Sequence, residues 1–246
     1  MVAAFSSVAA HVGTAGWAIP AGARDRFGDG ASALERYATR FDVAEINSSF
    51  HRPHRRSTYE RWAGSVPARF RFAVKLPKVI THERRLVDCA EPLARFAGEV
   101  TGLGGKRGPL LIQLPPSFAF EAGLVEGFLA ALRAALDGPV VCEPRHPSWF
   151  AAAIGGWLAE QRVARVAADP APVAEAAEPG GWPGLAYRRL HGSPRTYWSG
   201  YDADAIERHA AAAAQARVDG QESWTIYDNT AGGEAAGNAL AFDALL

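Results

Sequence analysis

The sequence lacks several features that would assign it to a protein class. It has two cysteines, Cys89 and Cys142, which lie far apart without a C-x-x-C spacing, so it has no disulfide framework and no thiolate metal site. Its 26 Lys and Arg balance its 26 Asp and Glu, so no global field attracts nucleic acid or membrane. Lysine is scarce and occurs as Lys75, Lys78 and Lys106. No stretch approaches the roughly 18 apolar residues of a membrane span, and the start of the chain has no basic region before its apolar run. These absences predict a soluble, cytoplasmic protein.

Strand-like runs separated by turn or helix signals recur along the whole chain. They cover residues 12–16, 43–47, 70–76, 109–114, a run from residue 140 that is stopped by Pro147, and residues 163–169, 186–191 and 224–229. Eight strands alternating with helices predict an α/β fold, a (β/α)₈ TIM-type barrel, and such barrels need about 250 residues. We therefore expect one domain over residues 1–246, with 1–11 as an N-terminal extension. The Pro-, Ala- and Gly-rich segment 170–184 predicts an irregular crossover between the sixth and seventh strands.

Three helix starts have their own signals. Ser32 with Glu35 and Ser57 with Glu60 have the spacing of capping boxes. Ser148 follows Pro147 and is expected to cap a helix that carries Trp149.

Nearly every expected strand ends in a polar or ionisable residue. In a barrel these ends converge on one rim, and ionisable clusters concentrate at functional sites. The alternative is that strands simply become polar as they leave the core. The residues concerned are Glu45, Asn47, Lys75, Gln113, Glu143, Arg145, Asp169, Arg189, His191 and Asn229, with Asp228 beside it.

The residue types at this rim predict anion binding and proton transfer. Arg145 and Arg189 can clamp an anion through paired donors, and Lys75 adds a point charge; alternatively, Arg145 is used in a buried ion pair. His191 is the best general acid or base, although a structural histidine fits the same position. A Schiff base at Lys75 is disfavoured, because nearby acids are expected to raise its pKa.

Metal and nucleotide sites have weaker support. Glu143, Asp169, His191 and Asp228 would be the ligands of a divalent metal, but arginines crowd the same rim and no HxH or HExxH spacing occurs. No GxGxxG follows a strand, so no cofactor is favoured. The basic clusters at 51–56 and 84–85, interleaved with aromatics, would suit nucleic acid, but solvated loops explain them better.

Seven motifs in order along the chain resemble the YecE-like family, domain of unknown function 72. They are GTAGW (13–17), EINSSF (45–50), FRFAVKLPKVITHERRL (70–86), QLPPSF (113–118), EPRHPSWF (143–150), RLHG (189–192) and DNTAGG (228–233). The resemblance implies a TIM-type barrel and does not define a reaction. The polar positions that match the family's motifs include His82 and His146 besides residues of the rim. The chain departs from the family at His51, at Pro144, which is expected to remove a ladder donor from a strand, and at Asp228, where the family often has Asn.

Three hypotheses about function remain open at this point. The first is a metal-independent hydrolase or lyase that acts on an anionic, phosphate-bearing small molecule. The second is a divalent-metal phosphodiester hydrolase or sugar isomerase, and the third is a non-catalytic protein that binds nucleic acid or another ligand. The candidate catalytic residues are Glu143, His191, Asp169 and Glu45, and the candidate ligand-binding residues are Asn47, Lys75, His82, Gln113, Arg145, His146, Trp149, Arg189, Tyr201 and Asn229. No membrane partner is expected, and the sequence does not define an oligomeric state.

Overall fold

The strands of the protein form two sheets in a computed structural model that describes residues 9–246. One sheet has the order β2 (Val43–Ile46), β3 (Arg71–Lys75), β4 (Arg107–Gln113), β5 (Val140–Glu143), β6 (Val163–Arg165) and β8 (Gly180–Gly181). The other has the order β1 (Ala10–Thr14), β10 (Glu222–Tyr227), β9 (Leu185–Leu190) and β7 (Ala167–Asp169). All pairs are parallel except β6 with β8. The expected α/β fold is confirmed.

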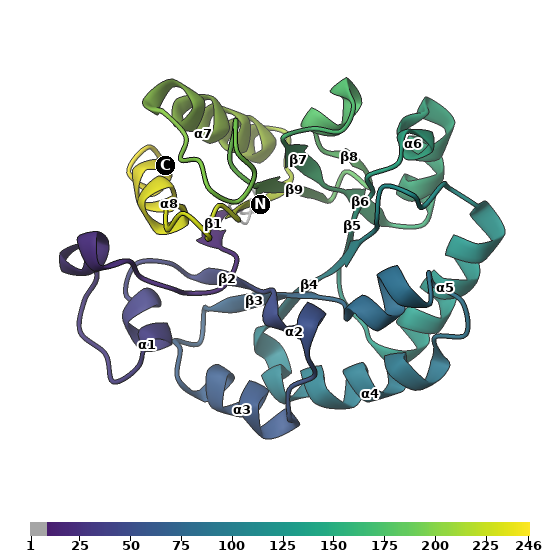
Figure 1. Ribbon diagram of the computed structural model, residues 1–246, viewed down its shortest axis with the longest axis horizontal. Coiled ribbons are helices and arrows are strands. Elements are labelled where there is room, and N and C mark those ends of the chain that lie inside the picture. The colour runs from purple at the N-terminus through teal and green to yellow at the C-terminus, as the bar shows by residue number, and fades with distance from the viewer. Residues whose placement is uncertain (1–8) are drawn as a thin grey trace, which may run out of the picture.

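The two sheets approach each other at two junctions. β6 and β7 are separated by Val166 alone, and the Val166 N–H donates to the Cys142 carbonyl at 2.8 Å. On the other side, Ala15 forms an isolated parallel bridge with Glu45, and the Gly16 N–H donates to the Glu45 carbonyl at 2.8 Å. Figure 1 shows the strands curving around one middle, with the helices on the outside.

The connections between strands are mainly α-helices. These are α1 (Ala33–Tyr37), α2 (Ser48–His51), α3 (Arg56–Gly64), α4 (Ala90–Val100), α5 (Ala122–Ala135), α6 (Ala152–Glu160), α7 (Ala203–Val218) and α8 (Ala235–Asp243). Short 3₁₀ segments are η1 (Ala21–Arg26), η3 (Thr101–Lys106), η4 (Pro147–Phe150) and η5 (Ala174–Ala177), and η2 (Val79–Glu83) is a π-helical turn. As expected, the crossover from β7 to β9 is irregular, consisting of η5 and the two-residue β8. No helix within residues 9–246 is long and apolar enough to cross a membrane.

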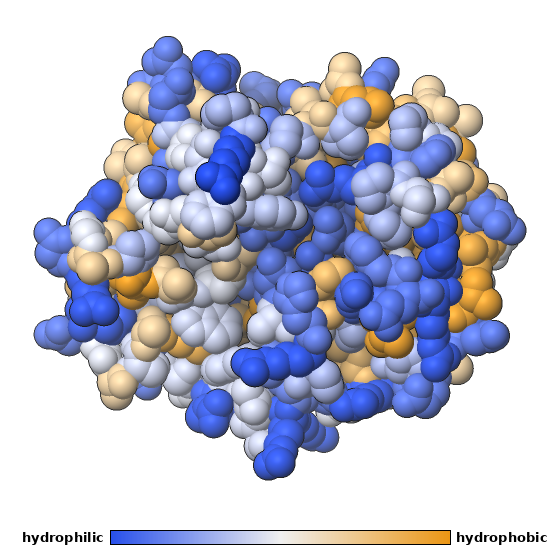
Figure 2. Space-filling model, viewed as in Figure 1, coloured by the Kyte–Doolittle hydropathy of each residue, from blue (hydrophilic) through white to orange (hydrophobic). Residues whose placement is uncertain are grey.

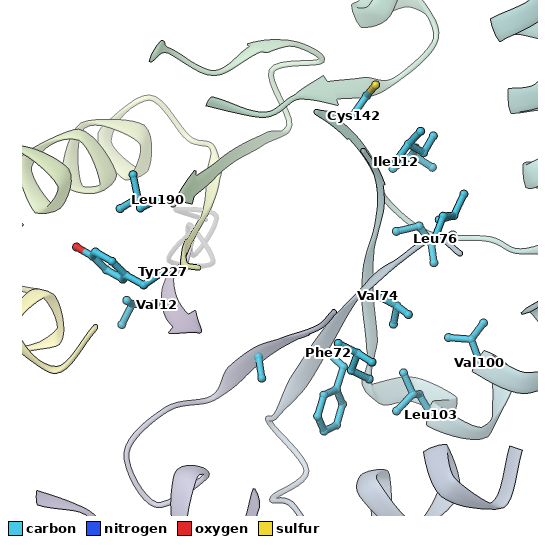
Figure 3. Close-up of a cluster of buried hydrophobic side chains, with 14 of the residues drawn as sticks. Val12, Phe72, Val74, Leu76, Val100, Leu103, Ile112, Cys142, Leu190 and Tyr227 are labelled. Atoms are coloured by element: carbon cyan, nitrogen blue, oxygen red, sulfur yellow. The ribbon is translucent and has the colours of Figure 1, made fainter. Parts of the chain in front are cut away.

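The side chains of the strands alternate between two apolar layers. Figure 3 shows the outer layer, in which Phe72 and Val74 of β3 face Val100 and Leu103 on the helical side. The inner layer is a separate cluster between the strands, formed by Val43, Ala73, Leu111, Val141, Ala164, Val166, Leu185, Tyr187, Trp224 and Ile226. The inward positions of each strand are therefore defined, and the next inward residues along several strands are the ionisable ones described below.

Some expected boundaries and caps differ from the structure. The first strand begins at Ala10, so residues 10 and 11 belong to the fold rather than to an extension, and residues 1–8 lie outside the described part. β5 ends at Glu143, so Pro144 follows the strand and removes no ladder donor.

One of the three predicted helix caps is present. The Ser32–Glu35 capping box forms at α1. Arg55 takes the N-cap position of α3, where Glu60 pairs with Arg56 instead of closing a box with Ser57. The hydroxyl of Ser148 accepts from the Phe120 N–H at 2.8 Å, outside α6, because Pro147 starts a 3₁₀ turn rather than the helix.

Candidate functional site

Six ionisable side chains converge where the strands end, on the inner side of the sheets. All are almost entirely buried, with Lys75 the most exposed at 7%. Each lies on the same face of its strand as the inner apolar layer, because side chains on one face recur every two residues. They are Glu45 from β2, Lys75 from β3, Glu143 from β5, Arg189 from β9, and His191 and Asp228 from just after β9 and β10.

Arg189 lies at the centre of this cluster and contacts three carboxylates. Its Nε and Nη2 donate to the two oxygens of Glu45 at 3.0 and 2.7 Å, a bidentate pair. Its Nη1 donates to Glu143 at 2.6 Å, and Nη2 also donates to Asp228 at 2.7 Å. From the layer below, the Tyr187 hydroxyl donates to Glu45 at 3.0 Å. Four of the five N–H donors of Arg189 are thus used within the protein, so the predicted clamping of a ligand anion by Arg189 would have to compete with these carboxylates.

His191 is held by three side chains. Its Nδ1 lies 3.1 Å from Asp228 Oδ2, and its Nε2 lies 3.1 Å from Glu143 Oε1 and 2.8 Å from Arg145 Nη2. A protonated Nε2 would donate to Glu143, whereas an unprotonated one would accept from Arg145, so Nε2 faces both an acceptor and a donor. Arg145 Nη2 also donates to Glu143. The predicted alternative of a buried pair between Arg145 and Glu143 is therefore the observed one.

The arginines keep the buried carboxylates ionised. Burial alone raises the pKa of the Glu143 carboxyl. Arg189, His191 and Arg145 reverse this and hold that pKa well below its usual range. The pKa of Asp228 is also lowered, because Arg189 and His191 outweigh the effect of burial. In turn, the carboxylates keep the pKa of Arg189 well above its ordinary value although burial lowers it.

The lowered carboxyl pKa values predict a specific dependence of stability on pH. A carboxyl group whose pKa is lower in the folded state than in the unfolded state stabilises the fold when the pH is above its unfolded pKa of about 4. This stabilisation is lost as the pH falls through the pKa of the folded state. We expect the free energy of unfolding to fall steeply below about pH 4. Asp228→Asn should make that fall shallower, as urea unfolding at several pH values would measure. An identical slope for both proteins would contradict this electrostatic description.

Lys75 belongs to the same buried cluster but has no paired partner among the described residues. Within residues 9–246 its Nζ makes no ion pair or hydrogen bond, and it lies 4.2 Å from the centre of the Phe50 ring. Burial lowers the pKa of Lys75, Arg189 lowers it further, and the carboxylates oppose this only in part, so the pKa falls from 10.5 to about 8. The nearby acids do raise this pKa, as expected, but burial and Arg189 outweigh them, so the expected net increase is wrong.

His82 joins Lys75 through the Phe50 ring. The His82 and Phe50 rings contact edge to face at 4.9 Å, and His82 Nδ1 lies 2.9 Å from the Thr81 hydroxyl. Burial lowers the pKa of His82, and the charges of Lys75 and Lys78 lower it further. This corner of the rim, made by Lys75, Phe50 and His82, therefore has a positive potential.

Asp169 is the clearest error among the predicted site residues. It pairs in register with Leu190, one position beyond the inward-facing Arg189, so its side chain lies on the outer face of the sheet. There it lines a cleft of about 590 Å³ with Arg188 and His209. It neither orients His191 nor joins a metal set at the rim.

Three other predicted ligand-binding residues have structural contacts. Trp149 is fully buried, and its Nε1 donates to the Phe118 carbonyl at 2.9 Å. The Tyr201 hydroxyl accepts from the Gly192 N–H at 2.8 Å and lies on the outer cleft rather than over the cluster. The Asn229 side chain donates to the Ser199 carbonyl at 3.0 Å and to Asn238 at 2.8 Å, which ties the loop after β9 to α8.

The remaining predicted residues lie at the edge of the cluster. Gln113 pairs in register with Glu143 and is half-buried. The Oδ1 of Asn47, just after β2, is buried and has no hydrogen-bond partner in the described part of the chain. His146 is half-buried and caps the turn that begins at Pro147 by accepting from the Ser148 N–H at 3.2 Å.

Sequence reasoning gave too little weight to two aromatic residues at this site. Phe50 lies between Lys75 and His82, and Tyr197 contacts the His191 ring edge to face at 5.5 Å. Tyr197 is 42% exposed, unusual for a large aromatic, and has a positive φ of 69°. Its loop position alone did not indicate contact with His191.

The described part of the chain does not place the four predicted metal ligands together. Residues 9–246 contain no group of three or more His, Cys, Asp or Glu side chains placed to hold a metal ion. Of the four proposed ligands, Asp169 faces away, and Arg189 donates to both Glu143 and Asp228.

Comparisons with known proteins agree on one family. The family described as "Protein of unknown function DUF72" matches residues 11–246. The UPF0759 protein YecE of Escherichia coli K12 is 29% identical over 150 residues, which are 58% of this chain and 54% of that protein. The corresponding protein of E. coli O157:H7 is 30% identical over 50% of this chain and 44% of its own length. The matched part thus spans about half the length of these curated relatives.

Solved structures show the same fold over nearly the whole chain. The crystal structure of a DUF72 family protein from Enterococcus faecalis V583 has a TM-score of 0.80 with 21% identity, covering 97% of this chain and 95% of that one. The structure of a DUF72 family protein from Thermotoga maritima MSB8 has a TM-score of 0.74 with 22% identity, covering 96% and 98%. The resemblance of the sequence motifs is confirmed, and the chain belongs to the DUF72 family.

Proposed function

We propose that this protein is a metal-independent enzyme of the lyase or hydrolase type that acts on an anionic small molecule, for which phosphate-bearing metabolites are the first candidates. Its active site is the cluster around Arg189, together with the corner formed by Lys75, Phe50 and His82. The two junctions between the sheets support treating them as one (β/α)₈ barrel. Barrels of this kind carry their active sites at the ends of the strands, which is where the cluster lies. Hydrophilic residues gather around the middle of the face in Figure 2.

The observation that carries this proposal is an unused donor on Arg145. Its Nε is buried and has no hydrogen-bond partner within residues 9–246, while its Nη2 contacts both Glu143 and His191. A buried donor without a partner is costly. Residues 9–246 contain other buried polar atoms without a partner, including Arg165 Nε and Arg188 Nη1, but Arg145 Nε is the charged donor among them that belongs to a residue bonded to the ionisable cluster. An oxygen of an anionic ligand would satisfy this donor. The positive potential at Lys75 and His82 favours the same type of ligand.

The cluster also suggests how protons move. Glu143 remains ionised because of its low pKa, so it acts as a fixed negative charge rather than as an acid. Arg145 Nη2 and Glu143 Oε1 both face the Nε2 of His191. A ligand anion that draws Arg145 toward itself would uncover Nε2, and an unprotonated His191 would then act as the general base. Asp228 contacts Nδ1 and so orients the ring for this role.

Calorimetric titration with inorganic phosphate tests the binding half of the proposal. We expect Arg145→Gln to weaken phosphate binding at least tenfold, about 1.4 kcal/mol, because the ligand loses a charge-assisted hydrogen bond. Arg85→Gln is the matched control, since Arg85 is exposed and bonds Ser117 away from the cluster, and it should bind as the unmodified protein does. Failure of the unmodified protein to bind phosphate at millimolar concentration, or equal losses in both variants, would contradict an anion site at Arg145.

A further inference from the structure

We infer that Lys75 is a nucleophile that forms a Schiff base with the carbonyl carbon of an anionic aldehyde or ketone. The inference rests on the proposed function, because it places the carbonyl of the substrate beside the same anion-binding site. It narrows the substrate class to compounds that carry a carboxylate or phosphate near a carbonyl group.

The position of Lys75 is the first support. It is the last residue of β3 and lies on the inward face, where its backbone pairs in register with Leu111 of the inner layer. Only 7% of the residue is exposed, so its amine faces the interior of the rim rather than bulk water. The Phe50 ring at 4.2 Å fixes the side chain from one side.

The lack of an ion pair at Lys75 is the second support. Three carboxylates belong to the same cluster, and their recorded hydrogen bonds are with groups other than Lys75; Asp228, for example, accepts from Arg189 through Oδ2. Both oxygens of Glu45 bind Arg189, and the oxygens of Glu143 are divided between Arg189 and Arg145. A buried lysine in a purely structural role would be expected to have an ion-pair partner. Lys75 has none within residues 9–246, so its amine is free to react.

The protonation of the amine agrees with this role. With a pKa of about 8, roughly a tenth of the amine is neutral at pH 7, far more than for an ordinary lysine. The other two lysines have partners: Lys78 is exposed and pairs with Glu83, and Lys106, whose pKa burial also lowers, donates to the carbonyls of Ala63 and Val66.

The chemistry of the step balances without a co-reactant. The neutral Lys75 nitrogen attacks the carbonyl carbon, a C–N bond forms, and the carbonyl oxygen takes up the proton that the amine gives away. The resulting carbinolamine loses its hydroxyl group and a second nitrogen-bound proton as water, which leaves the imine. His82, which shares the Phe50 ring with Lys75, is the group that would pass the proton to the departing hydroxyl.

Borohydride trapping with pyruvate as the probe tests the inference on the full-length protein. Reduction of the imine leaves a stable adduct that adds the mass of pyruvic acid less one oxygen atom, and peptide mass spectrometry locates it. Since the chain has three lysines, site assignment is direct. We expect the adduct at Lys75 at least tenfold above Lys78 and Lys106, and its loss in Lys75→Arg but not in Lys78→Arg.

The possible outcomes separate this inference from the proposed function. Equal labelling of the three lysines, or no adduct with pyruvate or glyoxylate in a protein that binds phosphate at Arg145, would overturn the Schiff base and leave the anion site standing. Labelling of Lys75 in a protein that binds no phosphate would support the nucleophile and overturn the anion site. Circular dichroism of Lys75→Arg shows whether this variant folds, and if it does not, the peptide map of the unmodified protein decides alone.

Discussion

Replacing Arg189 with Met is expected to destabilise the protein by about 3–5 kcal/mol, a large part of the stability of a typical domain. Arg189 is fully buried and donates to Glu45, Glu143 and Asp228. Without the positive charge of Arg189, three buried carboxylates would lose most of the hydrogen bonds and charge pairing that stabilise them in the interior. The free energy of unfolding in urea at pH 7 measures the effect.

Arg188→Met is the matched control for this prediction. Arg188 precedes Arg189 on β9 and is 8% exposed, but it points outward and makes no ion pair within residues 9–246. Its one hydrogen bond is a long contact of 3.4 Å to the Ala212 carbonyl, so we expect its loss to cost about 1 kcal/mol or less. Similar losses in the two variants would show that buried arginine in general, rather than the three-carboxylate centre, stabilises this region.

Replacing Lys75 with Met is expected to stabilise the protein while abolishing the trapping of pyruvate. A fall in the pKa of Lys75 from 10.5 to about 8 means that the charged amine costs the folded state about 3 kcal/mol at neutral pH. Met fills a similar volume without a charge and keeps contact with Phe50. We expect a gain of about 1–3 kcal/mol in the free energy of unfolding at pH 7.

This outcome distinguishes a functional from a structural lysine. A protein that retains an unfavourable buried charge usually does so for activity. Removal of that charge then raises stability at the expense of function. A lysine that stabilised the cluster would give a less stable Met variant instead. Lys78→Met serves as the control and should change stability little, because Lys78 is exposed and its pair with Glu83 is a surface contact of 3.4 Å.

The sequence predicts most of the fold and the location of the site for clear physical reasons. Strands covered on both faces are apolar, so the abrupt appearance of Glu45, Lys75, Glu143 and Arg189 at the ends of apolar runs indicates where those strands leave the core. The face on which each side chain lies is harder to predict, because it depends on the register of its strand. An error of one residue reverses the face, as happened when Asp169 was assigned to the rim.

The partners within the cluster could not be predicted from the chain alone. Arg145 and Arg189 are equally polar in sequence, yet Arg189 donates to three carboxylates, whereas the buried Nε of Arg145 has no hydrogen-bond partner within residues 9–246. The direction of the Lys75 pKa shift also depends on the folded structure, since burial and the charge of Arg189 lower this pKa more than the three carboxylates raise it. The hydrogen-bond partners that each cationic side chain has in the folded structure therefore decide whether it can still bind a ligand.

The central claim is that Lys75 is an unpaired, buried amine with a lowered pKa, and the stability difference between Lys75→Met and the unmodified protein tests it directly as a function of pH. Below about pH 8 the amine is charged in both states of the unmodified protein, so the advantage of the Met variant should be largest there. Between about pH 8 and 10.5 only the unfolded state binds the proton, which makes the unmodified protein gain stability with rising pH and the difference shrink. We expect the advantage of about 1–3 kcal/mol at pH 7 to decline steadily over that range. A difference that does not change from pH 7 to 10, or a Met variant that is less stable throughout, would contradict the claim.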